Sequence, residues 1–422
     1  MKGWLVRSLQ RRFGEVAKAN GVPFAIVLPD GAQMLFGEGP PRFTLRIERW
    51  RALRRFALHG HIGLLDSYFD GDIDIDVDGD LRWLLRIGMA GGISKPRLPV
   101  VLRNHWHEFR QNNRDWARAK ANARFHYALG ESFYRYWLDD PLMMYTCGYW
   151  SEGTRTLEEA QRNKVEHVCR KIQLMPGENV VDIGCGFGGF MLHAAEVHGA
   201  HVTGVNTTTE QVESVARRIG EFGLESKLHV VDTDFRDAFA QFDKVVSIGV
   251  LEHAGRDSVA EVVAAHAKFL RPGGLGMLHF IGHVGPMATE YFIRQHVFPG
   301  GWIPALAEVI VAMEDNGLEV VDIENLRRHY VLTLNAWAER FDKHWPEIHA
   351  LDPKRFDERF RRIWRTYLIG CAEMFGVPTS RTHLFQITFS KGNITPASYP
   401  MSRAFLYERA MERSEEAAWN LA

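Results

Sequence analysis

A carboxylate and three glycines are closely spaced in the segment between Val180 and Gly189. The segment reads VVDIGCGFGG, so that Asp182 precedes Gly184, Gly186 and Gly188. The flanking residues predict a buried strand, a tight turn and a helix, and glycines in such a turn let the backbone approach a ligand closely. Dinucleotide-binding turns favour the spacing GxGxxG and need no acidic residue at position 182. The carboxylate therefore favours a cofactor with a cationic end, such as S-adenosylmethionine.

The next expected strand ends at Val205, and polar residues beyond it should reach the same ligand. In S-adenosylmethionine-dependent methyltransferases an acidic residue here usually binds the ribose hydroxyls, but this sequence continues as NTTTEQ. We therefore expect Asn206, Thr207 and Gln211 to hydrogen-bond to the ribose, or Glu210 to turn inward.

The third expected strand is followed by Asp234, Phe235 and Arg236. These residues are predicted to cover the adenine, with the Phe235 ring supplying a flat apolar face. The alternative is that Phe235 is an ordinary core residue.

Two polar positions at the ends of later strands are candidates for chemistry. Glu252 and His253 follow the fourth expected strand, and His279 lies within the apolar fifth strand, LGMLHFI. A histidine inside a buried strand is usually a hydrogen-bonded core residue. Because parallel strands end at one crevice, Glu252 and His279 should nevertheless face the cofactor together. Neither has metal-ligand spacing, so no metal is predicted.

The chain from Leu157 onward alternates between expected helices and short apolar strands. The strands are 179–183, 201–205, 228–231, 244–248 and 275–281, and the helices are 157–172, 187–198, 210–222 and 258–269. This alternation predicts an α/β fold with the Rossmann-like, doubly wound parallel sheet of a class I methyltransferase. The helical, aromatic-rich segment 286–376 is expected to form a cap inserted before a last strand, 383–390.

A smaller α+β domain is expected before this sheet, spanning residues 1–115, with the methyltransferase domain at 116–422. Its beginning reads as short strands and turns, for example 24–28 and 44–50. Basic and apolar residues are interleaved in Lys2–Arg12, which predicts a short amphipathic helix, and 103–124 predicts a basic linking helix. Both could contact an anionic bilayer surface, and a solvated charge run is the alternative.

The overall composition is that of an ordinary soluble protein, 46% hydrophobic and 24% charged. Lys+Arg, 51 in number, balance 52 Asp+Glu, so nothing global indicates a nucleic-acid partner. The four cysteines lack CxxC or Cys/His spacing, which argues against a disulfide framework and a zinc site and favours a reducing cytosol. The sequence contains no apolar run of the roughly 20 residues needed to span a bilayer.

Longer motifs resemble the cyclopropane-fatty-acyl-phospholipid synthase family. Residues 125–134 read FHYALGESFY and 144–150 read MYTCGYW, similar to the family's HYDLGNDFY and YSCAYW. The likeness continues at 61–71, 180–189, 250–255, 278–282 and 329–341, so it covers nearly the whole chain. Thr146 and Gly148 stand where the family has Ser and Ala, and Asn206 replaces the more usual Thr.

The resemblance implies methyl transfer from S-adenosylmethionine to the cis double bond of an unsaturated acyl chain in a membrane phospholipid. In the family a bound bicarbonate then removes a proton from the transferred methyl group, and a cyclopropane ring closes. Its binding site maps here to Cys147, Glu252, His279, the backbone of Ile281 and Tyr330. Glu252 can accept from the bicarbonate OH, while the hydrogen-bond donors face its anionic oxygens.

The resemblance also assigns roles to Tyr145, Thr146 and Cys371. Tyr145 and Thr146 are expected to contact the cofactor. Cys371 occupies a position once considered catalytic in such enzymes, and helix packing is the preferred interpretation. Cys147 has no His/Asp relay in its neighbourhood, so it is expected to be a wall of the anion site rather than a nucleophile.

By the same resemblance, the protein is expected in the cytoplasm, visiting the inner face of the membrane to reach its lipid. Its first domain should assist lipid engagement or form a homodimer. Three alternatives stay open: a sister enzyme making methylene or methyl-branched chains, a non-catalytic lipid-binding protein, and a nicotinamide-dependent oxidoreductase. The intact glycines and polar residues of the anion site favour the cyclopropane reaction.

Overall fold

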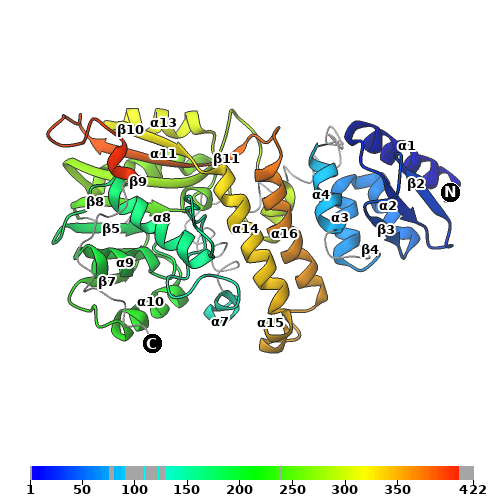
Figure 1. Ribbon diagram of the computed structural model, residues 1–422, viewed down its shortest axis with the longest axis horizontal. Coiled ribbons are helices and arrows are strands. Elements are labelled where there is room, and N and C mark those ends of the chain that lie inside the picture. Colours follow the sequence, from blue (N-terminus) through cyan, green and yellow to red (C-terminus); the bar gives the residue numbers. More distant parts are fainter. Residues whose placement is uncertain are drawn as a thin grey trace.

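The computed structural model describes residues 2–75, 80–90, 102, 106, 109, 122, 129–236 and 240–407. A large lobe built on a sheet occupies one end of the molecule and a small N-terminal lobe the other, with long helices α14 (Arg327–Lys343) and α16 (Glu358–Gly376) between them (Figure 1). The predicted basic helix at 103–124 and the family motif at 125–128 lie almost wholly outside the described residues.

The large lobe contains a seven-stranded sheet in the order β10-β11-β9-β8-β5-β6-β7. Every neighbouring pair is parallel except those made by β11, which runs antiparallel to both β9 and β10. The strands are β5 (Asn179–Ile183), β6 (His201–Asn206), β7 (Leu228–Asp232), β8 (Phe242–Ile248), β9 (Leu270–His283), β10 (Leu318–Asn325) and β11 (Thr382–Lys391). The predicted doubly wound sheet is confirmed, and the strand order reverses beside β5, where a ligand crevice is expected.

Helices cover both faces of this sheet through two separate apolar cores. On one face lie α8 (Leu157–Lys171), α9 (Gly189–Val197) and α10 (Thr209–Glu221), and on the other lie α11 (Val259–Phe269) and α13 (Leu306–Asp315). Helix α8 begins at a capping box, in which the Thr156 hydroxyl accepts from the Glu159 backbone N–H. Because helices bury the strands on both faces, the strands appear in the sequence as continuous apolar runs rich in β-branched residues.

The cap differs from the expected single insertion at 286–376. It consists of α12 (Tyr291–His296), α14, α15 (Trp345–Leu351) and α16, whereas α13 and β10 inside that range belong to the sheet layers. Strand β10 was not predicted from the sequence. It is an edge strand whose residues are mostly half-buried, so it lacks the alternation of apolar and polar residues that marks a strand.

The N-terminal lobe also contains more helix than the expected short strands and turns. Its elements are α1 (Lys2–Asn20), β1 (Phe24–Val27), β2 (Gln33–Phe36), β3 (Thr44–Ile47), α2 (Trp50–His59), α3 (His61–Phe69), β4 (Ile73–Ile75) and α4 (Asp80–Ala90). The predicted amphipathic helix forms, but Leu5, Leu9 and Phe13 bury its apolar face in the lobe's own core. Of the large apolar residues described in α1, only Trp4 is largely exposed, so the structure does not support a membrane role for this apolar face.

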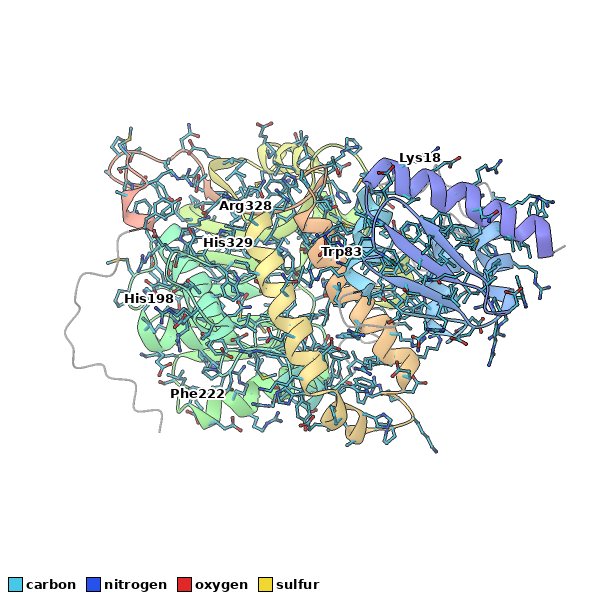
Figure 2. The ribbon with its side chains drawn as sticks, turned by 45° about the vertical axis from the view of Figure 1, so that its right-hand side comes forward. Lys18, Trp83, His198, Phe222, Arg328 and His329 are labelled. Carbon is cyan, nitrogen blue, oxygen red and sulfur yellow. The ribbon has the colours of Figure 1, made fainter. Side chains whose placement is uncertain are left out.

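The small lobe is fixed to α16 of the cap by charged pairs. Arg82 and Arg86 of α4 both bond to the buried carboxylate of Glu373, each with a contact of 2.6 Å. Figure 2 places Trp83 of α4 at this junction, where the small lobe meets the cap helix. Buried side chains of both lobes belong to one continuous apolar core. Within the described residues, no helix combines the length and apolarity needed to cross a bilayer.

Candidate active site

The glycine turn follows β5 as predicted, and its backbone explains the choice of residues. Gly184 has φ 70°, and a Cβ atom there would lie 2.2 Å from Val250 Cγ2, so a larger residue does not fit. Gly186 and Gly188 also have positive φ, and Gly188 is the N-cap of α9. A Cβ atom on Gly188 would meet Val215 of α10, so this glycine serves helix packing rather than the cavity wall.

Two adjoining cavities open beside this turn, one of about 440 Å³ and one of about 180 Å³. Both border on Gly184, Asn206, Thr207 and His253, so a single elongated ligand can occupy the two. Most of the predicted site residues line the larger cavity: Tyr145, Thr146, Asp182, Gly184, Gly186, Asn206, Thr207, Gln211, Glu252, His279, Ile281, Tyr330 and Cys371. Asp234, Phe235 and Arg236 line the smaller one. Cys147 and Gly188 are among the lining residues of neither.

Asp182 is a buried carboxylate near the end of β5. It lies near a buried lysine, Lys164, that was not predicted from the sequence. Burial raises the pKa of Asp182 to about 7, and the nearby Lys164 ammonium partly offsets this. Lys164, fully buried in α8, donates to Thr146 Oγ1 at 2.7 Å, and burial lowers its pKa. A cationic ligand in the cavity would favour the ionised form of Asp182. The lysine was missed because, in sequence, it looks like any polar helix residue.

The side chain of Asn206 is held by the protein itself. Its amide donates to Gln211 Oε1 at 3.1 Å and to the Gly186 carbonyl at 3.3 Å, and its Oδ1 accepts from the Thr208 backbone N–H. Asn206 and Gln211 therefore brace the glycine turn, in addition to lining the cavity. The alternative of an inward-turning Glu210 is wrong, because this residue is exposed.

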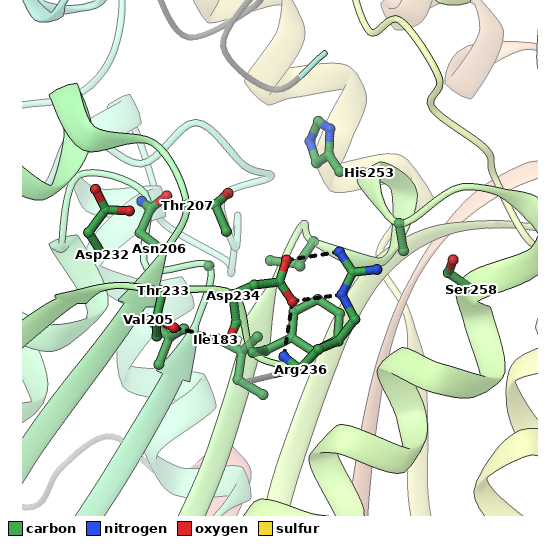
Figure 3. Close-up of a pocket in the computed structure, with 14 residues that line it drawn as sticks. Ile183, Val205, Asn206, Thr207, Asp232, Thr233, Asp234, Arg236, His253 and Ser258 are labelled. Carbon is green, nitrogen blue, oxygen red and sulfur yellow. Dashed lines mark hydrogen bonds and ion pairs between the residues drawn. The ribbon is translucent and has the colours of Figure 1, made fainter. Parts of the chain in front are cut away.

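The smaller cavity has the flat and polar walls that an adenosine needs. Arg236 bonds to both carboxylate oxygens of Asp234, at 2.8 and 3.0 Å, and its guanidinium lies 5.5 Å from the centre of the Phe235 ring. Figure 3 shows this pair, with His253 across the cavity and Asp232 beside Asn206. Asp232, at the end of β7, is an acidic residue near the expected ribose that was not predicted. Burial lowers the pKa of His253 to about 4, so its ring is neutral.

Glu252 and His279 meet in the larger cavity as predicted. Glu252 stands on the short 3-10 helix Leu251–His253, and its Oε1 accepts from the Ile281 backbone N–H at 2.6 Å. Its Oε2 is buried without a hydrogen-bond partner among the described residues, and burial raises its pKa to about 7. The Ile281 N–H, expected to donate to an anion, is thus already used by Glu252.

His279 is oriented by a residue that enters from the reversed strand. Gln386 lies directly opposite on β11, and its amide nitrogen is 3.1 Å from His279 Nδ1. With the amide in this orientation Nδ1 accepts, which leaves the proton on Nε2. That Nε2 is buried without a partner in the described part of the chain. Burial places the pKa of His279 well below its usual value, so the ring is neutral and can donate from Nε2.

Tyr330 of α14 completes this polar cluster from the cap side. It is buried, its pKa is raised well above the usual value by burial, and the groups that act on it include Tyr367, Cys147, Cys371 and Glu252. The phenol therefore keeps its proton and can only act as a neutral hydrogen-bond donor or acceptor.

Neither cysteine of the predicted site has the environment of a nucleophile. Cys147 is fully buried behind the cavity wall, where its thiol donates to the Gly148 carbonyl at 3.2 Å. Cys371 lies in the wall itself. Burial raises the pKa of both thiols to about 12, so both stay protonated. The expectation that Cys371 packs within a helix agrees with its place in α16.

Aromatic rings enclose the rest of the cavity. The Tyr145 hydroxyl donates to Tyr367 at 2.8 Å, and the Tyr145 ring packs against Trp337 with ring centres 5.3 Å apart. Phe298 and Phe375 add further apolar surface. The cap therefore supplies water-excluding walls around the polar cluster of Glu252, His279 and Tyr330.

One group of possible metal ligands occurs among the described residues, away from this cavity. Cys169, His193 and His198 place potential ligand atoms within 4.8 Å of one another. Nε2 of each histidine, however, lies within hydrogen-bond distance of Glu166 Oε2, at 3.2 and 2.8 Å, and burial keeps the Cys169 thiol protonated by raising its pKa. Figure 2 shows His198 at the end of the molecule opposite the N-terminal lobe. That catalysis needs no metal stays a prediction.

An elongated crevice at the strand reversal, with a buried carboxylate in its larger cavity and flat walls in its smaller one, fits S-adenosylmethionine. The Asp182 carboxylate suits the cationic end of this cofactor, and the Phe235 ring suits its flat adenine. Together with the single reversed strand β11, this crevice defines the class of S-adenosylmethionine-dependent methyltransferases.

Comparison with known proteins supports this class and identifies the family within it. The family model described as mycolic acid cyclopropane synthetase matches residues 114–387, and the chain belongs to this family. It is 32% identical over 353 residues to the cyclopropane-fatty-acyl-phospholipid synthase of Escherichia coli K12, covering 82% of this chain and 88% of the relative. A probable fatty acid methyltransferase of Pseudomonas putida is 34% identical over 368 residues, covering 84% and 89%.

A solved structure extends the comparison to three dimensions. The mycolic acid cyclopropane synthase CmaA1, in complex with SAH and CTAB, is 29% identical with a TM-score of 0.60. The match covers 98% of that chain but 64% of this one. The chain is therefore a cyclopropane-synthase-type methyltransferase that uses S-adenosylmethionine as its methyl donor.

Proposed function

We propose that the enzyme methylates the cis double bond of unsaturated acyl chains in membrane phospholipids and closes a cyclopropane ring with the help of bicarbonate. The observation that carries this proposal is the pair of buried polar atoms without described partners, Glu252 Oε2 and His279 Nε2, in an aromatic-walled cavity beside the glycine turn. Two such atoms at the wall of an apolar, aromatic cavity call for a small polar ligand, because unpaired buried polar groups are costly.

The acceptor needs no base for the first step. The π electrons of the olefin form a bond to the methyl carbon while the carbon–sulfur bond breaks, which leaves a carbocation on the acyl chain. Loss of a proton from the added methyl group then supplies the electron pair that closes the ring. Bicarbonate supplies the base for that proton when bound. Apolar, aromatic walls around the cavity exclude water that would otherwise trap the cation.

The residues of the chain would hold that base from three sides. Glu252 Oε2 can accept from the bicarbonate OH, and His279 Nε2–H and the Tyr330 OH can donate to its anionic oxygens. The Ile281 N–H holds Glu252 in place instead of contacting the anion, a change from the role that the family resemblance implied.

The test uses phospholipid vesicles with cis-monounsaturated chains and labelled S-adenosylmethionine, followed by mass spectrometry and NMR of the acyl chains. A gain of one CH₂ with cyclopropane proton signals and no olefin supports the proposal, and omission of bicarbonate from degassed buffer should slow the reaction. Label on a head group or on protein would refute it.

A second product class shares the first step. The similarity to the probable fatty acid methyltransferase of Pseudomonas putida supports a second product, a methylene or methyl-branched unsaturated chain, which forms when the cation loses a different proton. A methylene product has the same mass gain but retains an olefin, so the NMR spectrum separates the two. Visits to the inner face of the membrane and a homodimer stay predictions, which vesicle flotation and light scattering would test.

A further inference from the structure

A third cavity, of about 300 Å³, lies where the N-terminal lobe meets the cap. One side is formed by apolar residues of the small lobe, including Leu64 and Leu65 of α3 and Leu85 and Met89 of α4. Phe292 of α12 and the α16 helix form the other side. Water finds few hydrogen-bond partners in an apolar cavity, so the lining of this one suits a hydrocarbon.

This chamber adjoins the active-site cavity. Glu290, Ile293, Tyr367, Cys371 and Met374 line both cavities, so the two meet across these side chains. Tyr367 is also the hydrogen-bond partner of Tyr145 in the reaction cavity. An acyl chain whose double bond lies beside Glu252 and Tyr330 would therefore reach the chamber past these shared side chains.

The chamber is a built part of the fold, because its two sides are held together by specific contacts. Beyond the Arg82 and Arg86 pairs with Glu373, Arg362 of α16 donates to the Tyr68 carbonyl of α3 at 2.8 Å. A Cβ atom on Gly370 would lie 3.7 Å from Leu85 Cδ1, so α16 and α4 are close at this glycine. These contacts fix the width of the chamber.

Among the described lining residues, one pair of ionisable side chains borders the chamber. His61 Nε2 lies 3.3 Å from Glu290 Oε1, so each of these two groups has a partner. The remaining lining is dominated by apolar side chains. An ester or a head group would leave its polar atoms unpaired against such a wall, whereas the methyl end of a chain needs no partner.

We propose that this chamber binds the methyl-terminal segment of the substrate's acyl chain, so that the N-terminal lobe forms part of the substrate site and sets the chain length. The inference rests on the proposed function, because it requires an olefinic acyl chain in the reaction cavity. It assigns to the small lobe a direct contact with substrate.

The test is the Leu65→Trp variant, which fills the chamber from the small lobe. Detergent-dispersed phosphatidylglycerols with cis-monounsaturated chains would be supplied in two series, one lengthened on the methyl side of the double bond and one on the ester side. We expect a loss of about tenfold or more in kcat/KM for long methyl-side chains, little change for short ones, and no dependence on the ester-side length. Leu58→Trp, at an exposed leucine of the same lobe, is the matched control.

Leu65→Ala provides an independent variant that introduces no clash. It should shift the preference of the enzyme toward longer methyl-side chains. Calorimetric binding of S-adenosylhomocysteine by each variant checks that the fold is intact. If both variants keep the wild-type dependence of kcat/KM on methyl-side length, or change only in the ester-side series, the proposed role of the chamber is wrong. If the wild-type enzyme modifies none of these lipids, the proposed function fails, which is a different result.

Discussion

Replacement of Glu252 by glutamine should make the protein more stable at alkaline pH while removing its activity. The ionised carboxylate lies where the fold favours the neutral form: Oε1 accepts from Ile281 N–H, and Oε2 is buried without a described partner. Glutamine keeps an acceptor for that N–H and carries no charge. The two effects have opposite signs because the residue serves a ligand and not the fold.

The size of the stabilisation follows from the raised pKa of Glu252, about 7 against a usual 4.5. Between these pH values the folded protein holds a proton that the unfolded chain has released, so the free energy of unfolding falls as pH rises and stays lower above pH 7. The full pKa shift corresponds to a loss of roughly 3 kcal/mol in the free energy of unfolding. Glu252 lines the larger cavity, which opens to solvent when no ligand fills it, so in the ligand-free protein we expect about 1–2 kcal/mol above pH 8.

The assay is thermal and denaturant unfolding of the ligand-free protein at pH 5 and at pH 8.5, with turnover measured on vesicles. Glu252→Gln should gain stability over wild type at the higher pH only, and should lose about 10²-fold or more in kcat while S-adenosylmethionine affinity is retained. Glu314→Gln, at an exposed glutamate of α13, should show neither effect. A variant that is equally or less stable at pH 8.5, or that turns over normally, would refute this assignment of Glu252.

Further outcomes follow from the other groups of the site. Affinity for S-adenosylmethionine should rise between pH 6 and 8, because Asp182 ionises near pH 7; calorimetry should show this rise in wild type and its loss in Asp182→Asn, and a flat wild-type profile would contradict it. Tyr330→Phe should reduce turnover by about 10²-fold with cofactor affinity unchanged; a parallel loss of both would show that the anion site is misplaced. Cys371→Ala should retain turnover within about threefold, since its thiol stays protonated; an inactive, folded variant would restore a catalytic cysteine. Dialysis against EDTA should leave activity unchanged, and a loss restored by zinc would direct attention to the group at Cys169.

Much of the site could be inferred from local sequence because the chemistry is carried by short motifs. The positive φ of Gly184 and its close approach to Val250 leave room for glycine alone, so the turn is visible in one dimension. The expected strand 179–183 coincides with β5 because an apolar run bounded by turn residues is a strong signal. Glu252 and His279 were recognised because parallel strands end at one edge.

Residues that act from other elements could not be found in this way. Lys164 lies in a polar-looking helix, and Gln386 faces His279 only because β11 runs antiparallel beside β9. Strand β10 has no alternation, since an edge strand is half-buried along its length. The cluster of Cys169 with two histidines likewise comes from two helices packed together, which sequence spacing does not show.

The sequence by itself thus determined the class of enzyme, the cofactor turn and the polar groups of the reaction cavity. Only the tertiary structure decided how those groups are used: Ile281 N–H is taken up by Glu252, and burial sets the pKa values of Asp182 and Glu252 near 7. The tertiary structure also placed the N-terminal lobe against α16, where a chamber adjoins the active site. Burial, cavities and long-range hydrogen bonds depend on which surfaces meet, and that is not encoded in any single stretch of the chain.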